Sequence, residues 1–210
     1  FLSSAGETIH THHNLLGNNS EFFVNGGGTF DLLSGFNMRT LMFDNGDFNS
    51  NGHQVTSTFQ IGAGGTYTDV ADFSNSLVTV RLWIPGNGGD SFIVDGASFV
   101  CTGSFYGTWM DYYSVTLDDE NCSTSSPFQT EYFTVTAGSS VSIQEGSTIE
   151  AENITLVGTE DQPISLYSSV SGNEAFISKT TGTVEAWYLN LEDNHAIGGA
   201  TFNANMSTSI

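Results

Sequence analysis

Basic residues are almost absent from this sequence of 210 residues. Arg39, Arg81 and Lys179 are the only lysines and arginines, against 23 aspartates and glutamates, and the formal net charge is −20. Binding to nucleic acid requires clustered lysine and arginine side chains, so we expect no nucleic-acid partner. Anionic membrane surfaces are disfavoured for the same reason. The charge is typical of a protein that stays soluble in a salty exterior.

Long apolar runs are also missing. No stretch approaches the roughly 20 apolar residues that a membrane-spanning helix requires, so we expect no membrane insertion. The chain begins at Phe1 without a signal-peptide pattern and stops at Ile210 within a polar run. We therefore expect a segment of a longer protein that is secreted or displayed on the cell surface.

Cysteine is scarce, since Cys101 and Cys122 are the only two. Two cysteines are too few for an ordinary zinc site. Their separation of 21 residues corresponds to about one coil of many β-solenoids, which would stack one thiol on the other. In a secreted protein this arrangement predicts a disulfide between Cys101 and Cys122. The alternative is a pair of unbonded thiols in the core.

Helical patterns are missing as well, because apolar residues do not recur at helical spacing over any long window. The sequence instead shows short runs of β-branched and large residues, of which 77–83 (LVTVRLW) is the strongest. These runs predict an all-β protein with little or no α-helix. Turn residues separate the runs, and we expect structural turns at Gly46, Gly52, Gly96, Gly182, Gly198 and Gly199.

The spacing of these strands fits a sandwich, a barrel or a solenoid. Two features favour the solenoid. The segment 134–191 contains no Asn-Gly hairpin turn, and the phrases at 39–62 and 142–158 look like degraded copies of one another. We predict one continuous domain. It would consist of an N-terminal polar segment or first coil at 1–28, coils with Gly- and Asn-rich turns at 29–131, and further coils at 132–210.

The segment 44–52 (DNGDFNSNG) is rich in oxygen-bearing side chains. Asp44, Asp47, Asn49 and Asn51 are candidate calcium ligands, because calcium prefers carboxylate and amide oxygens at such spacing. The segment is not an EF-hand, since no glutamate stands at the twelfth position. The alternative is a turn capped by its own side chains. No cofactor is required by the sequence, and calcium is the candidate.

Two further clusters deserve a chemical test. His10 and His12 would share one face of a strand and form a transition-metal pair, or else belong to an exposed polar segment. The run Asp118–Glu120 is the densest group of acids, and glycoside hydrolysis does require two carboxylates. Solenoid galacturonases, however, pair a double Asp with a Gly-His-Gly turn and an Arg-x-Lys motif, and the sequence lacks both. We expect a solvated turn there and no catalytic residues.

The segment 158–204 (GTEDQPISLYSSVSGNEAFISKTTGTVEAWYLNLEDNHAIGGATFNA) resembles a recurrent phrase of giant secreted or cell-surface proteins that are frequent in gliding and marine bacteria. Many of these proteins are adhesins or repeat-rich exoproteins exported by the type IX route. The phrase at 40–61 (TLMFDNGDFNSNGHQVTSTFQI) resembles a second one. The resemblance implies a right-handed parallel β-helix and carries no catalytic residue set. The matching positions of the first phrase are Gly158, Thr159, Pro163, Ile164, Leu166, Ser168, Ser169, Gly172, Ile177, Ser178, Lys179, Gly182, Thr183, Val184, Tyr188, Leu189, Asp193, Ala196, Gly198, Gly199, Ala200 and Thr201.

The sequence thus predicts a non-catalytic structural or adhesive module that forms a stalk or fibre outside the cell. Its expected partners are neighbouring coils of the same protein, end-to-end copies of itself, and surface carbohydrate. Two alternatives stay open. One is a β-helix that binds or degrades carbohydrate, which an aromatic strip with paired acids on one face would indicate. The other is a viral receptor-binding fibre.

Overall fold

The computed structural model describes residues 20–63, 69–85 and 92–209. Within these ranges the regular elements are β-strands and no helix occurs, so none is long and apolar enough to cross a membrane. Parallel strands are stacked as a β-solenoid of about nine turns. The predicted all-β solenoid is therefore confirmed.

The chain divides into two compact units, Phe1–Val100 and Cys101–Ile210. The segment limits expected at residues 28 and 131 within one continuous domain both fall inside strands. Residue 28 lies inside β1 (Glu21–Asp31), which pairs with β2 (Phe36–Asn49). Residue 131 lies inside β10 (Phe128–Val135), which is hydrogen-bonded to a strand on each side.

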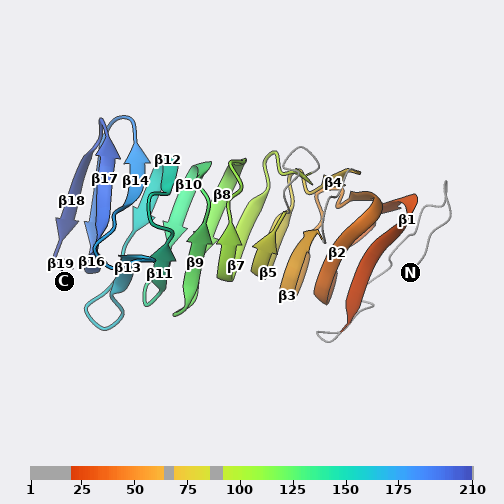
Figure 1. The fold of residues 1–210 in the computed structure, drawn as a ribbon, viewed down its shortest axis with the longest axis horizontal. Coiled ribbons are helices and arrows are strands. Elements are labelled where there is room, and N and C mark those ends of the chain that lie inside the picture. The colour runs from red at the N-terminus through yellow and green to blue at the C-terminus, as the bar shows by residue number, and fades with distance from the viewer. Residues whose placement is uncertain (1–19, 64–68, 86–91, 210) are drawn as a thin grey trace. The chain divides into compact units, whose positions relative to one another are not determined.

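In the first unit, each main strand pairs in parallel with the strand one coil further along the chain (Figure 1). β1 pairs with β2, β2 with β3, and β3 with β5, while the short β4 pairs with β2 and β6. The remaining bounds are β3 Val55–Ala63, β4 Ala71–Asp72, β5 Leu77–Ile84, β6 Phe92–Ile93 and β7 Ser98–Tyr106, which contains the division between the units.

In the second unit the strands form three parallel rows. β8, β10, β12, β14 and β17 pair in succession, as do β9, β11, β13, β16 and β19, and β15 pairs with β18. The bounds are β8 Asp111–Leu117, β9 Cys122–Ser125, β11 Ser140–Ile143, β12 Thr148–Leu156, β13 Ile164–Ser168, β14 Ala175–Lys179, β15 Thr183–Trp187, β16 Leu189–Glu192, β17 Asn194–Gly198, β18 Thr201–Asn205 and β19 Thr208–Ser209.

The pair Asn45-Gly46, which we expected to form a turn, lies inside β2. The register between β1 and β2 shifts on both sides of Asn25, so the strands bend there and keep their parallel pairing. Gly46 has a φ of 115°, and a Cβ on it would lie 2.7 Å from the carbonyl oxygen of Gly28. Gly46 is therefore required by a bend between two paired strands, not by a turn that ends one.

The other predicted turn glycines divide into two kinds. Gly52, Gly96, Gly182 and Gly198 have positive φ values of 72°, 68°, 86° and 93°. Gly199 has no positive φ, but a Cβ there would lie 2.3 Å from the carbonyl oxygen of Thr180. The absence of a side chain at Gly199 therefore allows two coils to approach closely. Gly199 is not needed for a left-handed turn conformation.

The length of a coil varies along the chain. Asp111 pairs with Gln129, an advance of 18 residues, whereas Thr148 pairs with Phe176, an advance of 28. Loops between the strands absorb the difference, because a loop can lengthen without disturbing the stacked strands. This variation explains why the repeats are visible in the sequence without a fixed period.

Aromatic side chains fill the core of each unit. In the first unit, Trp83 is fully buried and its ring centroid lies 4.7 Å from Phe99 and 5.6 Å from Phe92. In the second unit, Phe128 lies 5.3 Å from Phe105, with an edge-on orientation. Buried aromatic residues in such contact contribute more than their buried area alone, which stabilises a narrow core.

Candidate functional site

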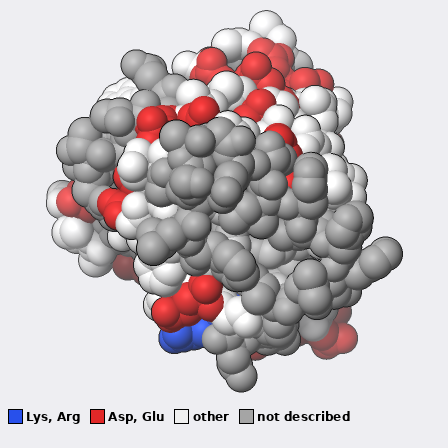
Figure 2. Space-filling view, turned by 90° about the vertical axis from the view of Figure 1, so that its right-hand side faces the viewer, with Lys and Arg blue, Asp and Glu red and all other residues white. Residues whose placement is uncertain are grey.

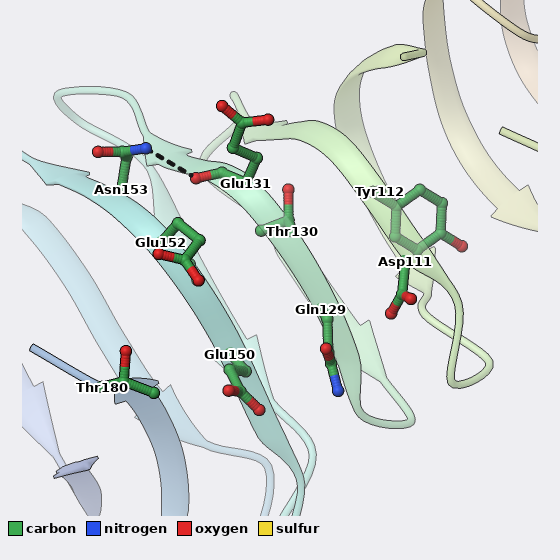
Figure 3. Close-up of a pocket in the computed structure, with 10 residues that line it drawn as sticks. Asp111, Tyr112, Gln129, Thr130, Glu131, Glu150, Glu152, Asn153 and Thr180 are labelled. Atoms are coloured by element: carbon green, nitrogen blue, oxygen red, sulfur yellow. Dashed lines mark hydrogen bonds between the residues drawn. The ribbon is translucent and has the colours of Figure 1, made fainter. Parts of the chain in front are cut away.

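A polar hollow of about 430 Å³ lies on the outer face of the second unit (Figure 3). Asp111, Gln129 and Glu150 form its first row, because Gln129 is the register partner of Asp111 on β8 and of Glu150 on β12. Side chains of register partners project on the same side of a parallel sheet. The other residues that line the hollow are Tyr112, Thr130, Glu131, Ala151, Glu152, Asn153 and Thr180.

A bend in the strands opens this hollow to solvent. Thr130 is buried, whereas the next two residues, Glu131 and Tyr132, are both exposed, which breaks the alternation of a straight strand. The Thr130 hydroxyl lies 3.0 Å from the carbonyl oxygen of Tyr132 and 3.3 Å from that of Tyr113. A hydrogen bond to one of these carbonyls holds the bend where the polar side chains turn outward.

Carboxylates dominate the chemistry of the hollow. Asp111, Glu131, Glu150 and Glu152 all line it. Lys179 at the end of β14 is the only lysine or arginine in the sequence of the second unit, and its Nζ donates to the carbonyl oxygen of Glu152. The hollow therefore repels anions and offers many acceptors to hydroxyl or amine donors.

Two tyrosines stand beside the hollow. The rings of Tyr113 and Tyr132 are 5.3 Å apart in an edge-on arrangement, and the side chains are 42% and 39% exposed. A hydrogen bond with the Glu131 carboxylate, together with the charge of that carboxylate, raises the pKa of Tyr132.

Sequence reasoning did not find this hollow or the tryptophan that lies near it. Trp109 is 79% exposed and lines a second hollow of about 120 Å³. Gln129 and Glu150 belong to both hollows, so the two adjoin. In the sequence, Trp109 follows the turn-forming Gly107 and precedes the strand that begins at Asp111. This position alone does not show that the Trp109 side chain is exposed.

The predicted calcium ligands are separate capping groups in the structure. A carboxylate oxygen of Asp44 accepts from the Asn25 amide at 2.7 Å, and one of Asp47 accepts from Val70 N at 2.9 Å. Asn49 accepts from Asn51 N at 2.8 Å, and the Asn51 amide donates to the carbonyl of Leu32 at 2.9 Å.

Among the described residues no group of three or more His, Cys, Asp or Glu side chains is arranged to hold a metal ion. His10 and His12 lie outside the described residues. Calcium binding by Asp44, Asp47, Asn49 and Asn51 thus stays a prediction for experiment.

Cys101 and Cys122 are free buried thiols in this structure, in place of the predicted disulfide. The Cys122 thiol lies 3.6 Å from the carbonyl oxygen of Cys101, so the two cysteines are neighbours as expected. They are not register partners, however, because Ser104 pairs with Ser123 and this register displaces Cys122 from Cys101 along the strand. Burial is the main cause that raises the pKa of Cys101 to about 12 and that of Cys122 to about 11.

The acidic run Asp118–Glu120 lies between β8 and β9, where the side chains of Asp118 and Asp119 accept hydrogen bonds. The Thr136 hydroxyl donates to Asp118 at 2.5 Å, and the Asn121 amide N–H donates to Asp119 at 3.0 Å. These contacts correspond to the solvated turn that the sequence suggested.

Comparison of the chain with models of protein families, with curated proteins and with solved structures finds no match.

Proposed function

We propose that this chain is a non-catalytic structural or adhesive module of a large extracellular or cell-surface repeat protein, of the kind whose phrases it resembles. The single observation that best supports this role is the parallel pairing of each coil with the next. Such a stack grows by adding coils without changing the ones already present. A stalk or fibre requires that property, whereas an enzyme does not.

The distribution of charge supports an extracellular structural role. Figure 2 shows one face on which described Asp and Glu side chains appear at several places, while Lys or Arg appears at one. Arg39 is already paired with Glu21 at 2.9 Å. Uniform negative charge keeps copies soluble and disfavours side-by-side association.

The last strands of the second unit offer a surface for axial contacts. β18 is paired within the described residues on one side only, with β15. Ile197 on β17 is 38% exposed, and Phe202 on β18 lines an apolar hollow of about 70 Å³ together with Leu156 and Leu189. An unpaired strand edge beside apolar side chains accepts another strand. Its partners in this proposal are neighbouring coils of the same protein or a second copy.

Surface labelling tests the proposed location. An antibody raised against the purified chain is applied to intact cells of the source organism and to permeabilised cells. We expect labelling of the intact cells, with no increase after permeabilisation. Labelling that requires permeabilisation would contradict an extracellular role.

A further inference from the structure

The turn Gly107–Met110 holds an exposed tryptophan in a backbone conformation that most comparable turns give to glycine or asparagine. Thr108 and Trp109 have φ values of 51° and 61°, and the turn is closed by a hydrogen bond from Met110 N to Gly107 O at 3.2 Å. Six other turns closed in the same way have, as their third residue, Gly52, Asn75, Gly96, Gly138, Gly146 and Gly172, all with positive φ, whereas Asp161 in the turn Thr159–Gln162 has none. A β-branched or bulky residue in this region is strained. Strain of this kind persists where the surrounding structure enforces it, and it is common at ligand-binding sites.

Neighbouring groups fix the position of this turn. Trp109 N donates to the carbonyl oxygen of Pro127 at 2.9 Å, and Gly107 N donates to that of Ser125 at 2.8 Å. A Cβ on Gly107 would lie 2.6 Å from the Phe128 ring, so the turn rests directly on the buried core. The indole of Trp109 nevertheless remains outside, with 79% of the side chain exposed. The turn therefore presents a large apolar ring to solvent from a backbone that hydrogen bonds hold in place.

Hydrogen-bonding groups stand next to the indole. The hollow of about 120 Å³ beside Trp109 is lined by Gln129 and Glu150, and these two residues lead into the larger hollow with Asp111 and Glu152. A flat aromatic surface beside amide and carboxylate groups fits a ring that is apolar on its faces and carries hydroxyls around its edge. A sugar ring has this character, because its C–H groups pack on an indole while its hydroxyls donate and accept at the rim.

We propose that Trp109, Gln129 and Glu150 form a binding site for an uncharged saccharide. The indole stacks on one sugar ring, Glu150 accepts hydrogen bonds from its hydroxyls, and Gln129 both donates and accepts. The next sugar units extend along Asp111 and Glu152. Polyanionic glycans are excluded, because the carboxylates of the hollow would repel their uronate or sulfate groups. This site is additional to the structural role proposed above and does not depend on it.

The test is titration of the whole chain with uncharged oligosaccharides, followed by tryptophan fluorescence and calorimetry. The probes are tetramers of glucose, mannose, galactose and N-acetylglucosamine. We expect at least one of them to bind and to shift the emission of Trp109, since Trp83 is fully buried and Trp187 is 41% exposed on a different strand. The proposal would be overturned if none of the four tetramers binds at concentrations up to about 10 mM. A dissociation constant of that size corresponds to a binding free energy of roughly −3 kcal/mol.

Variants assign the binding to this site. Trp109→Gly should lower the affinity at least tenfold while raising the melting temperature, because glycine relieves the strained φ. Trp109→Phe should retain much of the affinity, Glu150→Gln should lower it, and Trp187→Phe is the matched control that should change nothing. Undiminished binding by Trp109→Gly would refute the site. A Trp109→Gly variant that still binds sugar but no longer associates with a second copy of the chain would also refute the site.

Charged polysaccharides test whether the hollow binds an anionic ligand through a bridging calcium ion. A polyuronate and a sulfated polysaccharide are titrated with and without calcium at matched ionic strength. We expect no binding in either condition. Binding of the polyuronate that requires calcium would replace the proposed uncharged ligand with a cation-bridged anionic one.

Discussion

Gly62 on β3 stands where two coils approach more closely than any side chain allows. An ideal Cβ on Gly62 would lie 2.3 Å from the carbonyl oxygen of Ile84, its register partner on β5. Gly62 is not among the glycines with positive φ, so alanine could adopt its backbone conformation. The substitution Gly62→Ala therefore perturbs the distance between coils and little else.

The expected cost follows from that distance. Because ordinary contact of a Cβ begins at 3.4 Å, the two strands would have to separate by about 1 Å, and such overpacking costs about 1–3 kcal/mol. Replacing glycine by alanine also reduces the entropy of the unfolded chain, which stabilises the folded state by about 0.4–1 kcal/mol and offsets part of that cost. Because the contacting atom is backbone and cannot rotate away, we expect Gly62→Ala to lower the free energy of unfolding by about 2 kcal/mol.

Gly35→Ala is the matched control in the same unit. A Cβ on Gly35 would meet its nearest atom, the carbonyl oxygen of Gln54, at 3.5 Å, and Gly35 has no positive φ. We expect this variant to be neutral or more stable by up to about 1 kcal/mol. Urea unfolding is followed through the fluorescence of Trp83, which is fully buried and pairs with Ile61 beside Gly62. Both variants carry phenylalanine at positions 109 and 187, and equal stability of the two would refute the stacking of β3 on β5.

Three further predictions concern the core, the thiols and calcium. Phe133→Ala should cost about 3–5 kcal/mol of unfolding free energy in urea, because Phe133 is fully buried, whereas alanine at its exposed neighbour Tyr132 should cost less than about 1 kcal/mol. Thiol titration should find Cys101 and Cys122 unreactive at pH 8 in the native chain and both reactive after unfolding; no reactive thiol in the unreduced, unfolded chain would restore the disulfide. Burial raises the pKa of Cys101 from 9.0 to about 12 and that of Cys122 from 9.0 to about 11. The folded chain therefore gains its full stabilisation from the two protonated thiols below pH 9, and this stabilisation is lost as the pH rises towards 11–12. In thermal melts at matched ionic strength, calcium should raise the melting temperature slightly more than magnesium does, and Asp47→Asn should abolish the difference; equal shifts in the two salts would contradict a calcium site in segment 44–52 and leave a turn capped by its own side chains.

The fold class was predictable because it depends on patterns that survive variation in coil length. Runs such as 77–83 alternate in the sequence, and β5 covers Leu77–Ile84 in the structure. The bounds of turns were less predictable. Asn45-Gly46 resembles a hairpin turn locally, yet pairing with the coil before it keeps both residues in a strand. Local turn chemistry is overridden there by hydrogen bonds to a residue about one coil away.

The candidate site was not predictable, because it is assembled from several coils. Asp111, Gln129 and Glu150 become neighbours only through register, and advances of 18 and 21 residues separate them. A sequence without a fixed period does not fix that register. The exposure of Trp109 was equally hidden, since an isolated tryptophan in an all-β chain is more often part of the core.

A crystal structure of the chain tests the parallel solenoid most directly, through the register of the row that carries the candidate site. We predict that Gln129 lies between Asp111 and Glu150 on parallel neighbouring strands, with each pair of Cα atoms about 4.8 Å apart. Antiparallel pairing of β8 with β10, or a two-sheet sandwich that separates these three residues, would contradict both the fold and the site built on it.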